Sequence, residues 1–105
     1  MTTDPITVSV EGSRAVAELA GEFDMQATFV VEPALERALE EPGVDALEVD
    51  LSRLRFIDST GVGVLLRLTS EADRRGVDLS IRPAPREVQR VFEATGVSEA
   101  LPFGA

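Results

Sequence analysis

The amino-acid sequence predicts an α/β fold, a small mixed β-sheet packed with three to four helices, and three features lead to this prediction. Residues 6–10 and 15–20 are alternating or apolar segments separated by the turn-forming residues 11–13, which predicts a β-hairpin. Segments with helical spacing of apolar residues then alternate with short strand-like segments. Such alternation favours parallel pairing of the later strands, with helices packed on the sheet.

Glycine and proline set most of the expected boundaries. Pro42 and Gly43 end the first helix, and Gly76 is a natural cap for the second. Pro33 lies within the first helical segment, so this helix is expected either to kink there or to start there. The expected elements after the hairpin are a helix at 25–41, a strand at 44–51, a helix at 59–75, a strand at 77–82 and a helix at 85–95.

Length and charge limit the partners. The 105 residues fit one domain, 1–105, with neither a signal-like start nor an apolar run long enough to span a bilayer. The net charge of −9 disfavours binding to nucleic acid or an anionic membrane and favours encounter with a basic protein partner. The absence of cysteine fits a reducing compartment, so we expect a cytoplasmic protein.

Missing residue types argue against an enzyme. The sequence contains no His, Cys or Lys, and all ten basic residues are Arg. A Ser-His-Asp or Cys-His nucleophile, a Lys Schiff base, a Cys/His zinc site and a Lys-containing phosphate loop therefore cannot be built. We expect no catalytic residues, no metal site and no cofactor.

The polar tripeptide Asp58-Ser59-Thr60 lies between a strand exit and an apolar helix. Asp, Ser and Thr are preferred helix caps, so capping accounts for the tripeptide without any further function. The free N–H groups of a helix start can also receive an anion, such as a phosphate on Ser59. Gly61 and Gly63 are costly within a helix. They either leave the rim of the helix open to a partner or let the helix lie tightly on the sheet.

Residues 56–65, Phe-Ile-Asp-Ser-Thr-Gly-Val-Gly-Val-Leu, resemble the signature of the STAS family, the domain shared by anti-sigma factor antagonists and sulfate transporter tails. In those antagonists an aspartate-serine-serine/threonine-glycine segment, preceded by a hydrophobic pair, contains the phosphorylated serine. Residues 21–24 and 90–97 resemble two further family segments, and Pro33 departs from the usual pattern. The resemblance implies the STAS fold, an initial hairpin followed by a βαβαβ order.

The resemblance also implies a function. Ser59 would be phosphorylated by an ATP-binding serine kinase that is itself an anti-sigma factor, with Thr60 as a minor acceptor. The unphosphorylated chain would bind that kinase and release a sigma factor, phosphorylation would end the binding, and a phosphatase would reset the switch. Asp24 and Asp58 are expected at one carboxyl edge of the sheet, although capping explains Asp24 equally well. The expected partner-binding residues are Glu22, Asp24, Asp58, Thr60, Gly61 and Gly63.

Three alternatives differ from this interpretation. A receiver domain has a similar fold, but it needs a lysine that the sequence lacks. An acyl carrier protein also has a modified serine at a helix start, but such carriers are all-helical, and the alternating segments 6–10 and 77–81 argue against one. A STAS module that acts as a scaffold in another signalling complex or a lipid-transport assembly remains open.

Overall fold

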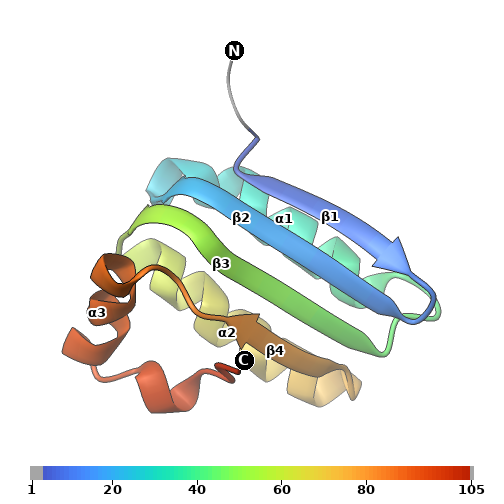
Figure 1. Ribbon diagram of the computed structural model, residues 1–105. Coiled ribbons are helices and arrows are strands. Elements are labelled where there is room, and N and C mark those ends of the chain that lie inside the picture. The colour runs from blue at the N-terminus through green and yellow to red at the C-terminus, as the bar shows by residue number, and fades with distance from the viewer. Residues whose placement is uncertain (1–3, 105) are drawn as a thin grey trace.

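The structure, a computed structural model that describes residues 4–104, contains a four-stranded sheet and three α-helices (Figure 1). The elements follow one another in the predicted order, and the α/β prediction is confirmed. They are β1 (Ile6–Glu11), β2 (Arg14–Phe23), α1 (Met25–Glu40), β3 (Ala46–Ile57), α2 (Ser59–Arg75), β4 (Asp78–Arg82), α3 (Arg86–Ala94) and the short 3-10 helix η1 (Ser98–Ala100).

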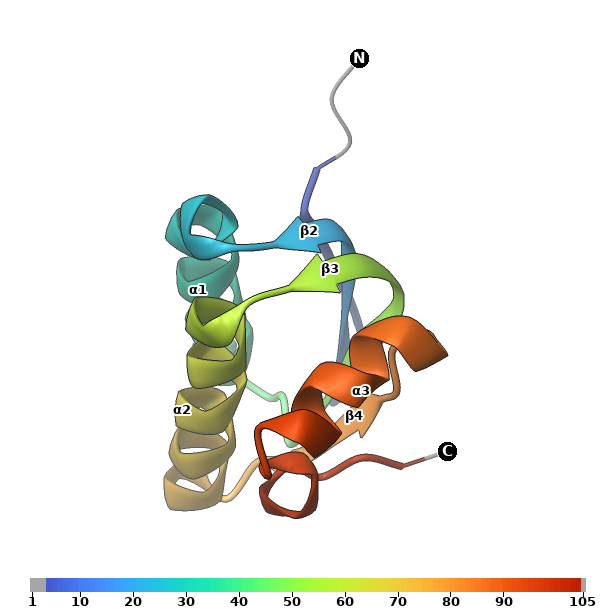
Figure 2. The same ribbon diagram turned by 90° about the vertical axis from the view of Figure 1, so that its left-hand side faces the viewer.

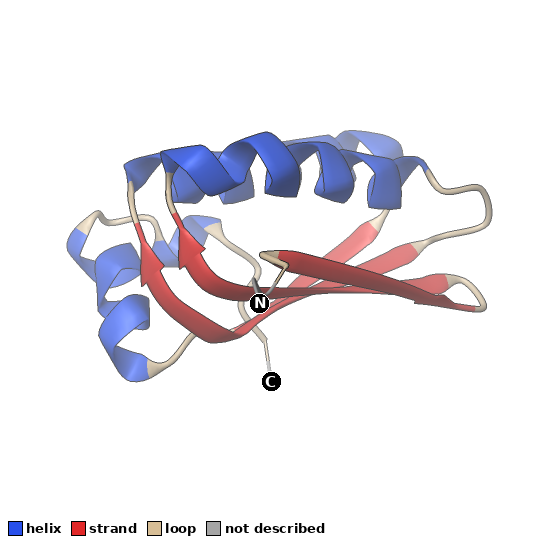
Figure 3. Cartoon of the chain, turned by 90° about the horizontal axis from the view of Figure 1, so that it is seen from above, coloured by secondary structure: helices blue, strands red, loops and turns tan. Residues whose placement is uncertain are grey.

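The strands lie in the order β1-β2-β3-β4, so each one pairs with its neighbour in the sequence. β1 is antiparallel to β2, with Ile6 opposite Leu19 and Val10 opposite Ala15. β2, β3 and β4 are parallel, which requires the helical crossovers α1 and α2. The carboxyl ends of β2 and β3 therefore meet at one edge of the sheet, and Figure 3 shows both strands leading there into helices.

Both crossover helices cover the same face of the sheet (Figure 2). Because both crossovers step in the same direction across the sheet, a shared handedness places α1 and α2 on one side. α3 lies on the opposite side of the sheet in Figure 2, and its buried Val88 and Phe92 belong to the same hydrophobic cluster. The fully buried side chains of this core include Leu19, Leu35, Val49, Leu65 and Ile81.

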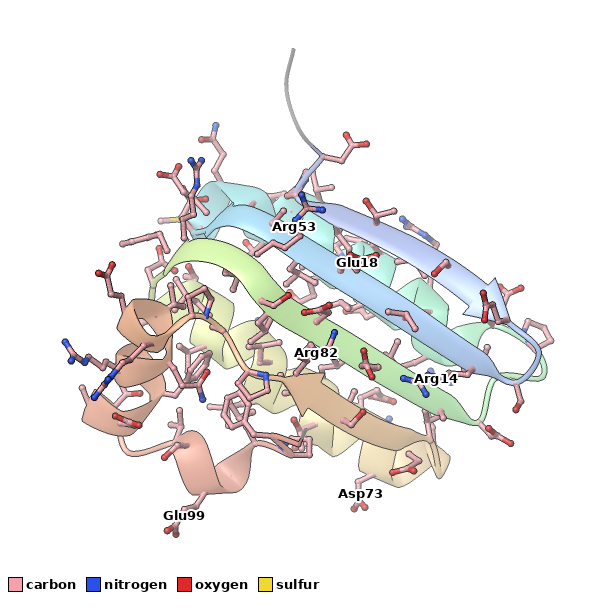
Figure 4. All side chains as sticks on the ribbon, viewed as in Figure 1. Arg14, Glu18, Arg53, Asp73, Arg82 and Glu99 are labelled. Carbon is pink, nitrogen blue, oxygen red and sulfur yellow. The ribbon has the colours of Figure 1, made fainter. Side chains whose placement is uncertain are left out.

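The face of the sheet that α1 and α2 leave open is lined by charged side chains. Arg14, Glu18, Arg53 and Arg82 lie on it in Figure 4, and Arg14 forms an ion pair with Glu48. Parallel strands that are covered on both faces usually have continuous apolar runs. The alternation of apolar and charged residues along β2 and β3 reflects full cover by α1 and α2 on one face and only partial cover, by α3, on the other.

The last described residues close the outer edge of β4. The Ile81 N–H donates to the Pro102 carbonyl at 2.9 Å, and the Gly104 N–H donates to the Ile81 carbonyl at 3.0 Å. The Phe103 ring packs edge-on against the buried Phe92 ring of α3, with the ring centroids 5.2 Å apart. Within residues 4–104, no further segment pairs with the outer edge of β1, the first strand of the sheet.

β3 is longer than predicted, because it continues past residue 51 to Ile57, where a connection was expected. β2 runs beyond the apolar segment 15–20 to Phe23, so that Asp24 directly follows the strand, as expected. The extension pairs Ala20 with Arg53 and Phe23 with Ile57 across two register shifts. Gly21, with a φ of 79°, lies at one of these shifts. The expected connection was wrong because irregular pairing removes the period-two pattern by which a strand is recognised.

α1 begins at Met25 and runs through Pro33 without ending. The predicted alternative of a helix start at Pro33 is therefore wrong. Asp24 fixes the start, because its side chain caps the helix. Pro33 is exposed, and its nitrogen has no hydrogen to donate to the Phe29 carbonyl one turn earlier.

Candidate functional site

The candidate site lies where β2 and β3 end side by side. Phe23 and Ile57 are paired in the parallel register, and Asp24 and Asp58 follow them directly. The Asp58 N–H donates to the Phe23 carbonyl at 3.3 Å, which joins the two chain segments just beyond the sheet. The expectation that both aspartates emerge at one carboxyl edge is confirmed.

Asp58 holds the starts of two helices. Its Oδ1 accepts the N–H of Thr60 at 3.0 Å, the N–H of Gly61 at 3.2 Å and the Thr60 hydroxyl, and so caps α2. Its Oδ2 accepts the N–H of Met25, the first residue of α1, at 3.3 Å. These donors all favour the ionised carboxylate. The Thr60 hydroxyl has the largest effect, and together with the backbone N–H groups it lowers the pKa of Asp58 below its ordinary value against the opposing effect of burial.

The lowered pKa of Asp58 predicts that protonation of this group destabilises the fold. Because the pKa of Asp58 is lower in the folded chain than in the unfolded chain, where it is about 4, the ionised carboxylate stabilises the fold at pH values above about 4. This stabilisation is lost as the pH falls through the pKa of Asp58 in the folded chain. Asp58→Asn keeps an oxygen as the cap but has no charge to lose. Its deficit in unfolding free energy relative to wild type should therefore be largest at pH 7 and shrink toward pH 3 in urea titrations. A deficit that is constant between pH 7 and pH 3 would contradict the assignment.

Asp24 and Glu22 differ in their surroundings. Asp24 is half-buried, and its Oδ1 accepts the Ala27 N–H at 2.9 Å, so the capping interpretation holds for α1 as well. Glu22 is exposed at the end of β2, opposite Phe56 in the register, and belongs to no ion pair within residues 4–104. Glu22 thus has an exposed charge without an ion-pair partner among the described residues, while the two aspartates cap helices.

Ser59 is the first residue of α2 and is exposed. Its hydroxyl has no hydrogen-bond partner among residues 4–104, whereas the neighbouring Thr60 hydroxyl donates to Asp58. The expectation that free N–H groups would receive a phosphate is wrong for Thr60 and Gly61, because Asp58 already accepts both N–H groups. A phosphate on Ser59 would instead add its charge beside a carboxylate, on the solvent side of the edge.

The two glycines of α2 have different environments. Gly61 is buried, and a Cβ built there would lie 2.6 Å from the Phe23 carbonyl oxygen and 2.8 Å from a side-chain carbon of Ile57. Close packing of the helix on the strand ends therefore accounts for Gly61. A Cβ at Gly63 would meet only the exposed Arg67 guanidinium, at 3.4 Å, so packing does not account for Gly63.

α1 and α2 start together and run side by side. Two ion pairs join them with the same offset of 35 residues, Glu32 to Arg67 at 3.0 Å and Glu40 to Arg75 at 3.3 Å. A groove of about 250 Å³ lies between the helices, and these charged pairs bridge it. The equal offset means that the first turns of both helices lie at the same level, which places α1 beside Ser59.

Sequence reasoning missed one part of this edge. Met25 and Phe29, one turn apart at the start of α1, are 61% and 77% exposed, although such side chains are usually buried. The sequence contained a sign of this exposure, because Met25 and Phe29 fall outside the apolar stripe of Val31, Leu35 and Leu39, which faces the core. A helical pattern with apolar residues on its outer face marks a candidate contact surface.

The described residues form neither a candidate metal site nor a helix that could span a membrane. No group of three or more acidic residues among residues 4–104 is placed to hold a metal ion. In the same part of the chain, no helix is long and apolar enough to cross a membrane. The edge around Ser59 presents an exposed hydroxyl, the Glu22 carboxylate and the apolar side chains of Met25 and Phe29.

The edge thus combines an exposed serine at the start of α2 with two aspartates that cap α1 and α2. The chain belongs to the STAS domain family, because the family model described as "Mlab, STAS domain" matches residues 6–102. An anti-sigma-B factor antagonist from Listeria monocytogenes is 31% identical over 83 residues, which are 79% of this chain and 72% of that protein. This likeness places the chain among the anti-sigma factor antagonists of the family, which are regulatory binding proteins and not enzymes.

Solved structures show the same fold. The anti-sigma factor antagonist SpoIIAA in its unphosphorylated form is 23% identical and superposes with a TM-score of 0.77, over 95% of this chain and 88% of that one. The Bacillus cell fate determinant SpoIIAA in its phosphorylated form is 22% identical with a TM-score of 0.71, over 95% and 91% of the two chains. The predicted STAS fold is confirmed.

Proposed function

We propose that the unphosphorylated chain binds an anti-sigma factor through the edge around Ser59 and thereby releases a sigma factor. The anti-sigma factor is also the ATP-dependent serine kinase that phosphorylates Ser59. Phosphorylation ends the binding, and a phosphatase restores it. The proposed contact residues are Glu22, Asp24, Asp58, Thr60 and Gly63, with the buried Gly61 beneath them, and the proposed setting is the cytoplasm.

The observation that supports this proposal most directly is the state of the two neighbouring hydroxyl groups. Ser59 offers an exposed hydroxyl with no internal partner among residues 4–104, while the Thr60 hydroxyl is engaged by Asp58. A kinase can therefore reach Ser59 without opening the fold, which favours Ser59 over Thr60 as the acceptor. The structures of SpoIIAA in two phosphorylation states belong to a protein with the same fold.

Electrostatics support the direction of the switch. A phosphate adds about −1.5 to −2 charge at pH 7. Asp58 lies at the same helix start and is held ionised by its donors. In water the added charge is largely screened, but in an interface that excludes water it must be desolvated beside another anion. The phosphorylated edge is thus a poor binding surface, although the fold itself does not change.

Incubation with ATP and each purified anti-sigma factor of the source genome should add about 80 Da to the chain, as measured by intact-mass spectrometry. Peptide mapping should place the added group on Ser59. Ser59→Ala should abolish the shift and Thr60→Val should keep it, because the Thr60 hydroxyl serves as an internal donor. A shift that persists in Ser59→Ala would overturn the assignment of the site.

A second candidate function is a STAS scaffold in another signalling or lipid-transport assembly. The description of the matching family model, which names Mlab, is the observation that favours it. Under this hypothesis the chain forms a stable complex whose affinity does not depend on ATP. The mass measurement separates the two functions, since only the proposed switch gains a phosphate.

A further inference from the structure

Exposed apolar side chains gather at the Ser59 end of the molecule. Met25 and Phe29, here called the α1 apolar patch, are 61% and 77% exposed. They occupy the first turns of one helix, on the same side at a spacing of four residues. Exposing an aromatic ring in this way costs free energy in water, which a partner surface that buries the ring would recover.

The patch is fixed beside the switch serine by the hydrogen bonds of Asp58. One oxygen of Asp58 caps the helix that begins with Ser59, and the other accepts the N–H of Met25, the first residue of the patch. The equal offsets of the ion pairs between α1 and α2 keep the two first turns level. A partner that covers Ser59 on this side therefore also meets the patch.

The surroundings of the patch indicate the chemistry of its partner. Glu22 and Glu36 are exposed on either side of it along the chain and belong to no ion pair within residues 4–104, whereas Glu32 is paired with Arg67. Pro33 has no N–H to give to the Phe29 carbonyl, which leaves an acceptor at the patch. A complementary surface has an apolar centre with basic, hydrogen-donating residues at its rim. A second copy of this chain, with net charge −9, is a poor match.

We propose that the α1 apolar patch is the anchoring half of the surface that binds the anti-sigma factor, and that its occupant is an apolar, basic-rimmed face of that protein. This inference rests on the proposed function. It divides the surface into two parts. The patch supplies affinity in both phosphorylation states, and Ser59 supplies the change in affinity between them.

The test is the affinity of variants for the purified anti-sigma factor that phosphorylates Ser59, measured by isothermal titration with ADP in place of ATP. Phe29→Ser should weaken binding by roughly 30-fold, as expected for an aromatic anchor at an interface. The matched control is Val10→Thr, an apolar side chain that is 48% exposed at the opposite end of the sheet, where Val10 pairs with Ala15. This control should bind as wild type does, and both variants should keep the wild-type melting temperature.

The outcomes separate the two proposals. If Phe29→Ser binds like wild type while Ser59→Asp binds weakly, the patch proposal is overturned and the proposed function stands. If the wild-type chain binds none of the anti-sigma factors, both proposals fail. If wild type alone is a dimer in light scattering and Phe29→Ser is a monomer, the occupant is a second copy, and the patch proposal is overturned.

Discussion

Phosphorylation of Ser59 should weaken binding of the anti-sigma factor by about 150-fold, which corresponds to roughly 3 kcal/mol, and Ser59→Asp should weaken it by about tenfold. The aspartate adds about half the charge of a phosphate, so it reproduces only part of the effect. The physical reason is that the Asp58 carboxylate already occupies this helix start. A second anion would have to lose its water there without gaining the N–H donors that Asp58 holds.

Two variants make this prediction specific to position and charge. Ser59→Ala should bind as tightly as the unphosphorylated chain and stay bound when ATP is added. Ser70→Asp adds the same charge to an exposed serine of the same helix, away from the edge, and should leave the affinity unchanged. Surface plasmon resonance at two salt concentrations measures these effects. Equal losses for Ser59→Asp and Ser70→Asp would mean that net charge, and not the site, controls binding.

Gly61→Ala should destabilise the fold by about 2 kcal/mol, although alanine is the better helix former. Helix propensity alone favours alanine by about 1 kcal/mol. A Cβ at position 61, however, would lie 2.6 Å from the Phe23 carbonyl oxygen, a backbone atom held in the sheet. Relief of that overlap requires α2 to move off the strand ends, and overpacking of this kind costs about 1–3 kcal/mol and more.

Gly63→Ala is the matched control for the packing argument. Its Cβ would meet only the end of the flexible Arg67 side chain, so the gain in helix propensity should dominate. We expect a rise in stability of about 0.5–1 kcal/mol. The two variants, two residues apart in one helix, should thus shift the urea midpoint in opposite directions. Equal shifts would contradict the close approach of α2 to Phe23.

Local pattern was sufficient for much of the fold. The bounds of α2 at Ser59 and Arg75 were predicted because Asp58 precedes a clear apolar stripe and Gly76 follows it, and the structure confirms both ends. The parallel edge that brings Asp24 and Asp58 together also followed from the order of elements. These features depend on neighbours in the sequence or on general rules of topology.

Features that depend on contacts between distant residues could not be predicted in this way. The extension of β3 to Ile57 requires pairing with β2 through irregular register, which no local period reveals. The hydrogen bond from Met25 to Asp58 joins residues 33 positions apart. The sequence suggested two explanations for both glycines, and only the positions of Phe23 and Ile57 assign close packing to Gly61.

The antiparallel pairing of β1 determines where a tag can be attached in binding experiments. Ile6 lies opposite Leu19, near the end of β2 from which the Ser59 edge begins, so a fusion joined before β1 enters the molecule beside the proposed contact surface. At the opposite terminus, the last described residue is Gly104, which bonds to Ile81, and Ile81 pairs with Val49 in the first third of β3, far from Ile57. Immobilisation through that terminus keeps the linker and the sensor surface away from Ser59 and the α1 apolar patch.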